Sequence, residues 1–134
     1  ALEALKASTT DTDECDIVVP RNRIAVFSRF ADEKMKEYGI RISIQGHAGD
    51  GNMHIQLMRD DMDKALFSER VPLLMKELYA KARELDGQVS GEHGIGHAKK
   101  GYLAQSVGED ALELMRGIKK AFDPNGILNP GKLF

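Results

Sequence analysis

The chain has 134 residues, a net charge of −2 and a single cysteine, Cys15. This length suits one domain with a substantial core, and the 42% apolar and 30% charged fractions exclude a disordered chain. Basic residues form no concentrated block, so there is no electrostatic basis for nucleic-acid binding. No apolar stretch approaches the roughly 18 residues of a membrane span, and no signal peptide is evident. Because one cysteine cannot form an internal disulfide and suits a reducing compartment, we expect a cytoplasmic protein.

The first part of the chain predicts a strand followed by a helix. Residues 1–8 are typical of the end of a helix. The β-branched stretch at residues 16–19, which Pro20 stops, predicts a strand. Apolar residues then recur at helical spacing over residues 24–38, and Gly39 stands where a C-terminal cap belongs.

The middle of the chain predicts a β-hairpin and a second long helix. Apolar and polar residues alternate strictly over residues 40–45 and again over 53–57, which predicts two strands joined by a long glycine-rich loop. Residues 68–85 carry an apolar stripe at helical spacing, with Pro72 acceptable in the first turn. Residues 88–90 are a candidate fourth strand.

The last part of the chain predicts two further helices and an irregular tail. A short helix is expected over residues 97–103. Ser106 and Glu109 have the spacing of a capping box, which predicts the start of another helix. Residues 123–126 form a stop and a turn. The element order β-α-β-β-α-β-α predicts an α+β fold of ferredoxin-like type, with a mainly antiparallel sheet and helices packed on one face.

The histidines offer the first indication of chemistry. All four stand near glycines in the middle of the chain: His47, His54, His93 and His97. If the isoleucines of residues 40–45 face the core, strand alternation points His47 and His54 to the opposite face, near one end of the hairpin. Two imidazoles placed in this way could share a metal ion, and Asp50 and Asn52 could orient them.

A second glycine-rich loop adds a carboxylate and another imidazole. Glu92 would complete a set of two histidines and one carboxylate, which catalytic zinc and some iron sites use. His93 would then be a candidate general base. Taken singly, each of these residues also fits a hydrogen-bonded loop side chain, and His97 fits a structural role. Only their concentration in two short loops favours a metal or catalytic site.

Three segments carry a family resemblance. Residues 46–54 read GHAGDGNMH, residues 91–96 read GEHGIG, and residues 123–132 read DPNGILNPGK. In this order they resemble the GHxGDGNxH, GEHGIG and DPxGILNPGK motifs of the C-terminal domain of FAD-linked oxidases. That family includes the FAD subunit of glycolate oxidase, D-lactate dehydrogenases and D-2-hydroxyglutarate dehydrogenase. The resemblance covers essentially residues 16–134.

The resemblance implies a metal centre and a base. His47 and His54 match the two metal-ligating histidines of the family, and Glu92 matches its carboxylate ligand. His93 matches the base that takes the substrate hydroxyl proton. The implied metal is divalent, with zinc as the first choice and iron or manganese as alternatives.

The resemblance also implies contacts to substrate and flavin. Gln56 stands where the family usually has a substrate-contacting asparagine and is one methylene longer. Asn52, in the first motif, is expected to contact the substrate as well. Asn129 and Lys132 match the closing motif, which lies near the flavin in relatives. The implied reaction is oxidation of a 2-hydroxy acid, with hydride passing to FAD.

We expect residues 1–134 to be part of a C-terminal substrate domain, with the N-terminal FAD-binding domain absent and the isolated chain inactive. The truncated helix at residues 1–8 supports this expectation. A partner subunit or a homodimer is a further expectation. Two alternatives stay open: a free-standing α+β module that binds a metal or a partner without redox activity, and a metal-dependent hydrolase built on His47, His54 and Glu92.

Overall fold

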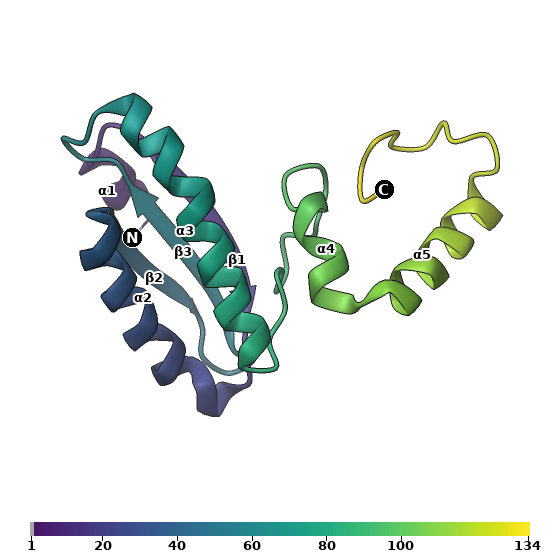
Figure 1. Ribbon diagram of the computed structural model, residues 1–134, viewed down its shortest axis with the longest axis horizontal. Helices are drawn as coiled ribbons and strands as arrows, with labels where there is room; N and C mark the ends of the chain where they lie inside the picture. The colour runs from purple at the N-terminus through teal and green to yellow at the C-terminus, as the bar shows by residue number, and fades with distance from the viewer. Residues whose placement is uncertain (1) are drawn as a thin grey trace. The chain divides into compact units, whose positions relative to one another are not determined.

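The computed structural model describes residues 2–134, which form two compact units (Figure 1). The first unit ends at Glu92 and the second runs from His93 to Phe134. The elements of the first unit are α1 (Leu2–Ala7), β1 (Thr12–Val18), the 3₁₀ turn η1 (Arg21–Arg23), α2 (Ile24–Tyr38), β2 (Arg41–His47), β3 (Asn52–Met58) and α3 (Lys64–Glu84). Those of the second unit are α4 (Lys100–Val107) and α5 (Glu109–Phe122).

The three strands of the first unit form one antiparallel sheet in the order β1-β3-β2. Helix α2 contacts β2 and helix α3 contacts β1, and the two helices also contact each other. The predicted α+β class is therefore confirmed. Where a fourth strand was expected, Gln88 makes only one antiparallel bridge, to Val18, so the described residues do not show the ferredoxin-like topology.

The apolar side chains of the strands and of the helices pack into one core. In the paired strands, Cys15 lies opposite Ile55 and Ile17 opposite Met53, and all four side chains are buried. The helices contribute fully buried side chains to the core, namely Phe27, Ala31, Leu74, Leu78 and Ala82. Removing these apolar surfaces from water is the main force that holds α2 and α3 on the sheet.

Several predicted boundaries require correction. Helix α3 begins at Lys64, because the Asp63 carboxylate caps it by accepting hydrogen bonds from the Ala65 and Leu66 amides at 2.9 and 3.1 Å. Pro72 therefore lies inside the helix rather than in its first turn, at an exposed position.

The expected capping box is also wrong. Ser106 lies within α4, and Gly108, with φ of 82°, precedes α5 without a side-chain capping hydrogen bond. Helix α4 itself begins at Lys100, later than the expected start at residue 97. Strand β1 begins at Thr12, four residues before the expected strand, and this extension matters for the site.

Candidate metal and substrate site

One face of the sheet gathers polar side chains. In the register of β2 with β3, Gln45 lies opposite His54 and His47 opposite Asn52. Because side chains alternate between faces, these four lie on the face opposite to Ile44 and Ile55. The predicted shared face of His47 and His54 is confirmed: their ring centroids lie 5.8 Å apart with an interplanar angle of 85°.

The turn between β2 and β3 is tighter than the sequence predicts, since only residues 48–51 connect the strands. The His47 carbonyl accepts hydrogen bonds from the Asp50 and Gly51 amides at 3.1 and 3.0 Å. Gly51 has φ of 87°, and a Cβ there would lie 2.0 Å from the Val19 carbonyl oxygen. Only glycine fits this position, which explains why a glycine-rich segment forms a short turn.

Glu92 approaches both histidines. Its Oε1 lies 2.9 Å from His54 Nε2 and 3.9 Å from His47 Nε2. One ligand atom from each of the three residues lies within 4.8 Å of the other two. Imidazole nitrogens and a carboxylate oxygen are ligands that zinc and other divalent transition metals accept, so the arrangement fits such an ion.

Burial differs among the three residues. The His47 and Glu92 side chains are 61% and 51% exposed, whereas that of His54 is 19% exposed. Two of the three ligand candidates therefore face solvent, which leaves access for a small molecule.

Glu14 is a residue that the sequence analysis missed. Its Oε1 lies 3.8 Å from His54 Nδ1, on the other side of the imidazole from Glu92. His54 therefore lies between two acidic side chains, with Glu92 at hydrogen-bond distance from Nε2 and Glu14 farther away, beside Nδ1. The alternation of β1 would have placed Glu14 on the polar face, had the strand been extended to Thr12.

Asn52 and Gln56 lie on the polar face but present little surface. Asn52 is 4% exposed and Gln56 is 3% exposed. A Cβ added to Gly91 would lie 2.3 Å from Asn52 Oδ1, so the backbone of the second glycine loop lies directly against this side chain. Asp50, expected to orient the histidines, instead accepts a hydrogen bond from the Asn52 amide at 2.9 Å and shapes the turn.

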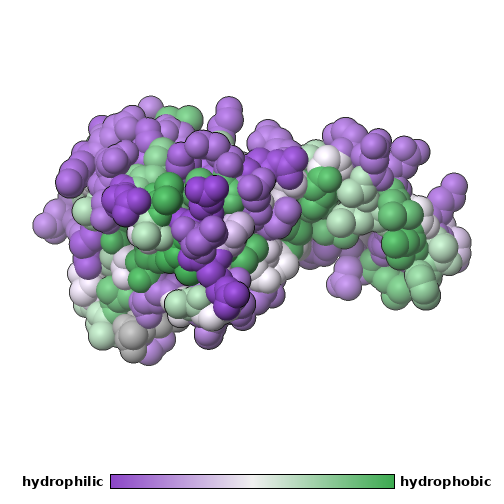
Figure 2. Space-filling model, turned by 90° about the horizontal axis from the view of Figure 1, so that it is seen from below, coloured by the Kyte–Doolittle hydropathy of each residue, from purple (hydrophilic) through white to green (hydrophobic). Residues whose placement is uncertain are grey.

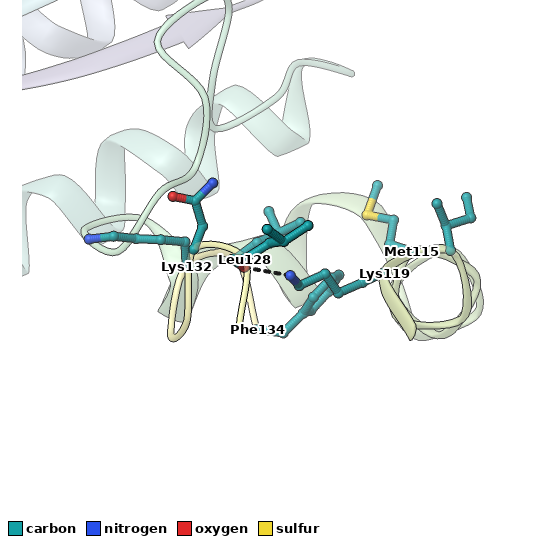
Figure 3. A pocket seen from close by; sticks show the side chains of 8 residues that line it. Met115, Lys119, Leu128, Lys132 and Phe134 are labelled. Carbon is teal, nitrogen blue, oxygen red and sulfur yellow. Dashed lines mark hydrogen bonds between the residues drawn. The ribbon is translucent and has the colours of Figure 1, made fainter. Parts of the chain in front are cut away.

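The remaining predicted site residues belong to the second unit. His93 is its first residue and is exposed. Asn129 and Lys132 line a cavity of about 390 Å³ within this unit, together with apolar side chains that include Met115, Leu128 and Phe134 (Figure 3). At its edge the Lys119 ammonium donates a hydrogen bond to the Leu128 carbonyl at 2.6 Å (Figure 3).

Comparison with known proteins identifies the family. The profile of the family described as "FAD linked oxidases, C-terminal domain" matches residues 1–133, and the chain belongs to this family. It is 49% identical over 132 residues to a D-lactate dehydrogenase of Anaerostipes hadrus, covering 98% of the chain and 28% of that protein. It is 40% identical over 134 residues to glycolate oxidase subunit GlcD of Bacillus subtilis, covering 100% and 28%. It is also 36% identical over 122 residues to a D-2-hydroxyglutarate dehydrogenase of Stutzerimonas stutzeri, covering 89% and 26%.

The chain thus spans between 26% and 28% of the length of these relatives. Along residues 2–134, no helix combines the length and the apolar character needed to cross a membrane.

Proposed function

We propose that the chain forms the metal- and substrate-handling part of an FAD-linked dehydrogenase that oxidises a 2-hydroxy acid. The observation that carries this proposal is the convergence of His47, His54 and Glu92 on the polar sheet face. Relatives named for D-lactate, glycolate and D-2-hydroxyglutarate support the substrate class.

The residues would divide the work as follows. His47, His54 and Glu92 would hold the divalent metal, and such an ion would supply Lewis-acid chemistry that lowers the pKa of a substrate hydroxyl. His93 would take the hydroxyl proton as general base, and Asn52 and Gln56 would orient the acid. Asn129 and Lys132 would face the FAD, the cofactor that accepts hydride in this chemistry.

Metal binding tests the ligand assignment. We expect calorimetric titration of the chain with Zn²⁺ to find one site, and His54→Ala to lower its affinity by at least about 100-fold, since loss of a ligand exceeds the effect of losing an outer partner. His97→Ala is the matched control, because His97 belongs to the other unit and contacts the Gly131 carbonyl instead. If the His54 and His97 variants bind Zn²⁺ equally well, the ligand assignment is wrong.

A chimera tests the redox assignment. This chain would replace the aligned 28% of the Anaerostipes hadrus D-lactate dehydrogenase, and anaerobic loss of flavin absorbance would be followed after adding D-lactate, glycolate or D-2-hydroxyglutarate. We expect at least one acid to reduce the flavin and His93→Ala to slow this reduction by about 10² to 10⁴-fold, as loss of a general base does. Flavin reduction that is equally fast in the His93→Ala and His97→Ala chimeras would exclude His93 as the base.

A further inference from the structure

Strand β1 contains a fully buried carboxylate that the proposed function does not use. Asp16 is 0% exposed and lies opposite His54 in the register of β1 with β3. A buried carboxylate is costly unless hydrogen bonds compensate for its lost hydration. The partners of Asp16 therefore indicate its role.

Three donors from consecutive residues converge on one oxygen of this carboxylate. Asp16 Oδ2 accepts hydrogen bonds from Ser90 Oγ at 2.8 Å, from the Gly91 amide at 3.0 Å and from the Glu92 amide at 3.1 Å. Hydrogen bonds to an ionised acceptor are about twice as strong as neutral ones. The last of these donors is the backbone of Glu92, the residue whose side chain reaches His54 and His47.

The same loop has no regular secondary structure to hold it. After the single bridge at Gln88, residues 89–92 belong to no helix or strand. The Glu92 side chain is half exposed, so packing cannot fix its place. The backbone of this loop also lies against Asn52, because a Cβ added to Gly91 would be 2.3 Å from Asn52 Oδ1.

We propose that Asp16 is the positioning residue of the metal site: it fixes the backbone of residues 90–92 so that the Glu92 carboxylate meets His54. This inference rests on the proposed function for the identity of the site. It assigns Asp16 no contact with metal or substrate. A purely structural Asp16 would stabilise the chain without affecting the geometry between Glu92 and His54.

The experiment compares Asp16→Asn with Asp13→Asn in the full chain. Both changes remove one carboxylate from β1, but Asp13 is exposed, and its carboxylate accepts a hydrogen bond from the neighbouring Glu14 amide rather than from residues 90–92. In Asp16→Asn we expect the Gly91 and Glu92 amides to lose hydrogen-exchange protection while the paired amides of β2 and β3 keep theirs. We expect Zn²⁺ affinity to fall by about 10- to 100-fold, the effect of losing an outer partner of a metal ligand. Asp13→Asn should change neither.

A spectroscopic readout separates this inference from the proposed function. Without metal, Asp16→Asn should shift the ring resonances of His54 in the same direction as Glu92→Gln, since both changes disturb the same contact. If the wild-type chain binds no Zn²⁺ but these shifts coincide, the metal site fails and the positioning role of Asp16 stands. Unchanged His54 resonances, or lost amide protection with full Zn²⁺ affinity, would overturn the positioning role.

Ser90→Ala keeps the test decisive if Asp16→Asn does not fold. This variant removes the Ser90 hydroxyl and leaves the Gly91 and Glu92 amides as donors to Asp16 Oδ2. We expect a smaller loss of Zn²⁺ affinity, of a few-fold, together with faster exchange of the Gly91 and Glu92 amides. A Ser90→Ala chain with wild-type exchange and wild-type His54 resonances would contradict the proposal.

Discussion

The two units of the chain differ in how many of their large apolar side chains are exposed. The first unit leaves few of its large ones exposed, and its fully buried side chains include Phe27, Leu74 and Leu78. Among residues 3–134, whose exposure is described, seven large hydrophobic side chains are exposed, and five of them belong to the second unit: Leu114, Ile118, Phe122, Ile127 and Leu128. Figure 2 shows hydrophobic side chains on the surface of this unit, at the right of the view.

This difference indicates that apolar residues have a different role in each unit. In the first unit, apolar residues build a core that supports the polar face with His47 and His54. In the second, α5 leaves Leu114, Ile118 and Phe122 exposed at a spacing of four residues, and an exposed apolar patch is typical of a surface that binds another molecule. We therefore expect substitutions in the first unit to change stability and those on the apolar surface of the second to change association.

Matched leucine truncations give the largest expected effect. Leu78 in α3 is 0% exposed and Leu114 in α5 is 67% exposed. We expect Leu78→Ala to lower the free energy of unfolding by about 2–5 kcal/mol, because it leaves a cavity in the core. Leu114→Ala should change it by less than about 0.5 kcal/mol. Urea denaturation followed by circular dichroism measures both.

An equal loss of stability in both variants would break the comparison. It would mean that Leu114 is covered in solution, and the elution volume of the chain in gel filtration would then show whether a second copy covers it. A chain that is monomeric and loses stability only with Leu78→Ala would instead sharpen the comparison.

Glycine substitutions should act in opposite directions in the two units. Gly51 has positive φ and a Cβ there would meet the Val19 carbonyl oxygen, so Gly51→Ala should lower the free energy of unfolding by more than about 1 kcal/mol. Gly117 lies within α5 with nothing near its missing Cβ, so Gly117→Ala should raise it by about 0.5–1 kcal/mol. The same urea denaturation measures both, and a stabilising Gly51→Ala would contradict the tight turn described above.

Local patterns predicted most of the first unit. Alternation predicted that His47 and His54 share one face, and helical spacing predicted both ends of α2 correctly. The contact of Asp16 with residues 90–92 was missed, because its partners lie about 75 residues away and a carboxylate at the expected start of a strand gives no sign of burial. Glu14 was missed for a simpler reason, since the strand was expected to begin at Asp16, after Glu14, whereas it begins at Thr12.

The second unit was harder to predict because its helix ends depend on backbone conformation. The Ser106 and Glu109 spacing fits a capping box, but Gly108 turns the chain between α4 and α5, so Ser106 stays inside a helix. The predicted end of the helix at residues 123–126 is correct, since α5 ends at Phe122. This turn depends on local contacts of the Asp123 side chain, which is why the local sequence predicts it. The Asp123 carboxylate accepts hydrogen bonds from the Ile127 and Leu128 amides at 2.9 and 3.0 Å.

Acid titration gives the smallest expected effect and compares one carboxylate from each unit. The hydrogen bond from Lys119 holds the pKa of Asp123 below its ordinary value of 3.8, and the hydrogen bond from Arg41 does the same for Asp60. Because both folded values are lower than the unfolded ones, each ionised carboxylate stabilises its unit above about pH 3.8, and this stabilisation is lost as pH falls through the lowered pKa. In NMR spectra we expect the Ile127 and Leu128 amide resonances to titrate below pH 3.8 and to stop doing so in Asp123→Asn, while Asp60→Asn leaves them unchanged. A midpoint at or above pH 3.8 would show that the Lys119 contact does not hold the turn in solution.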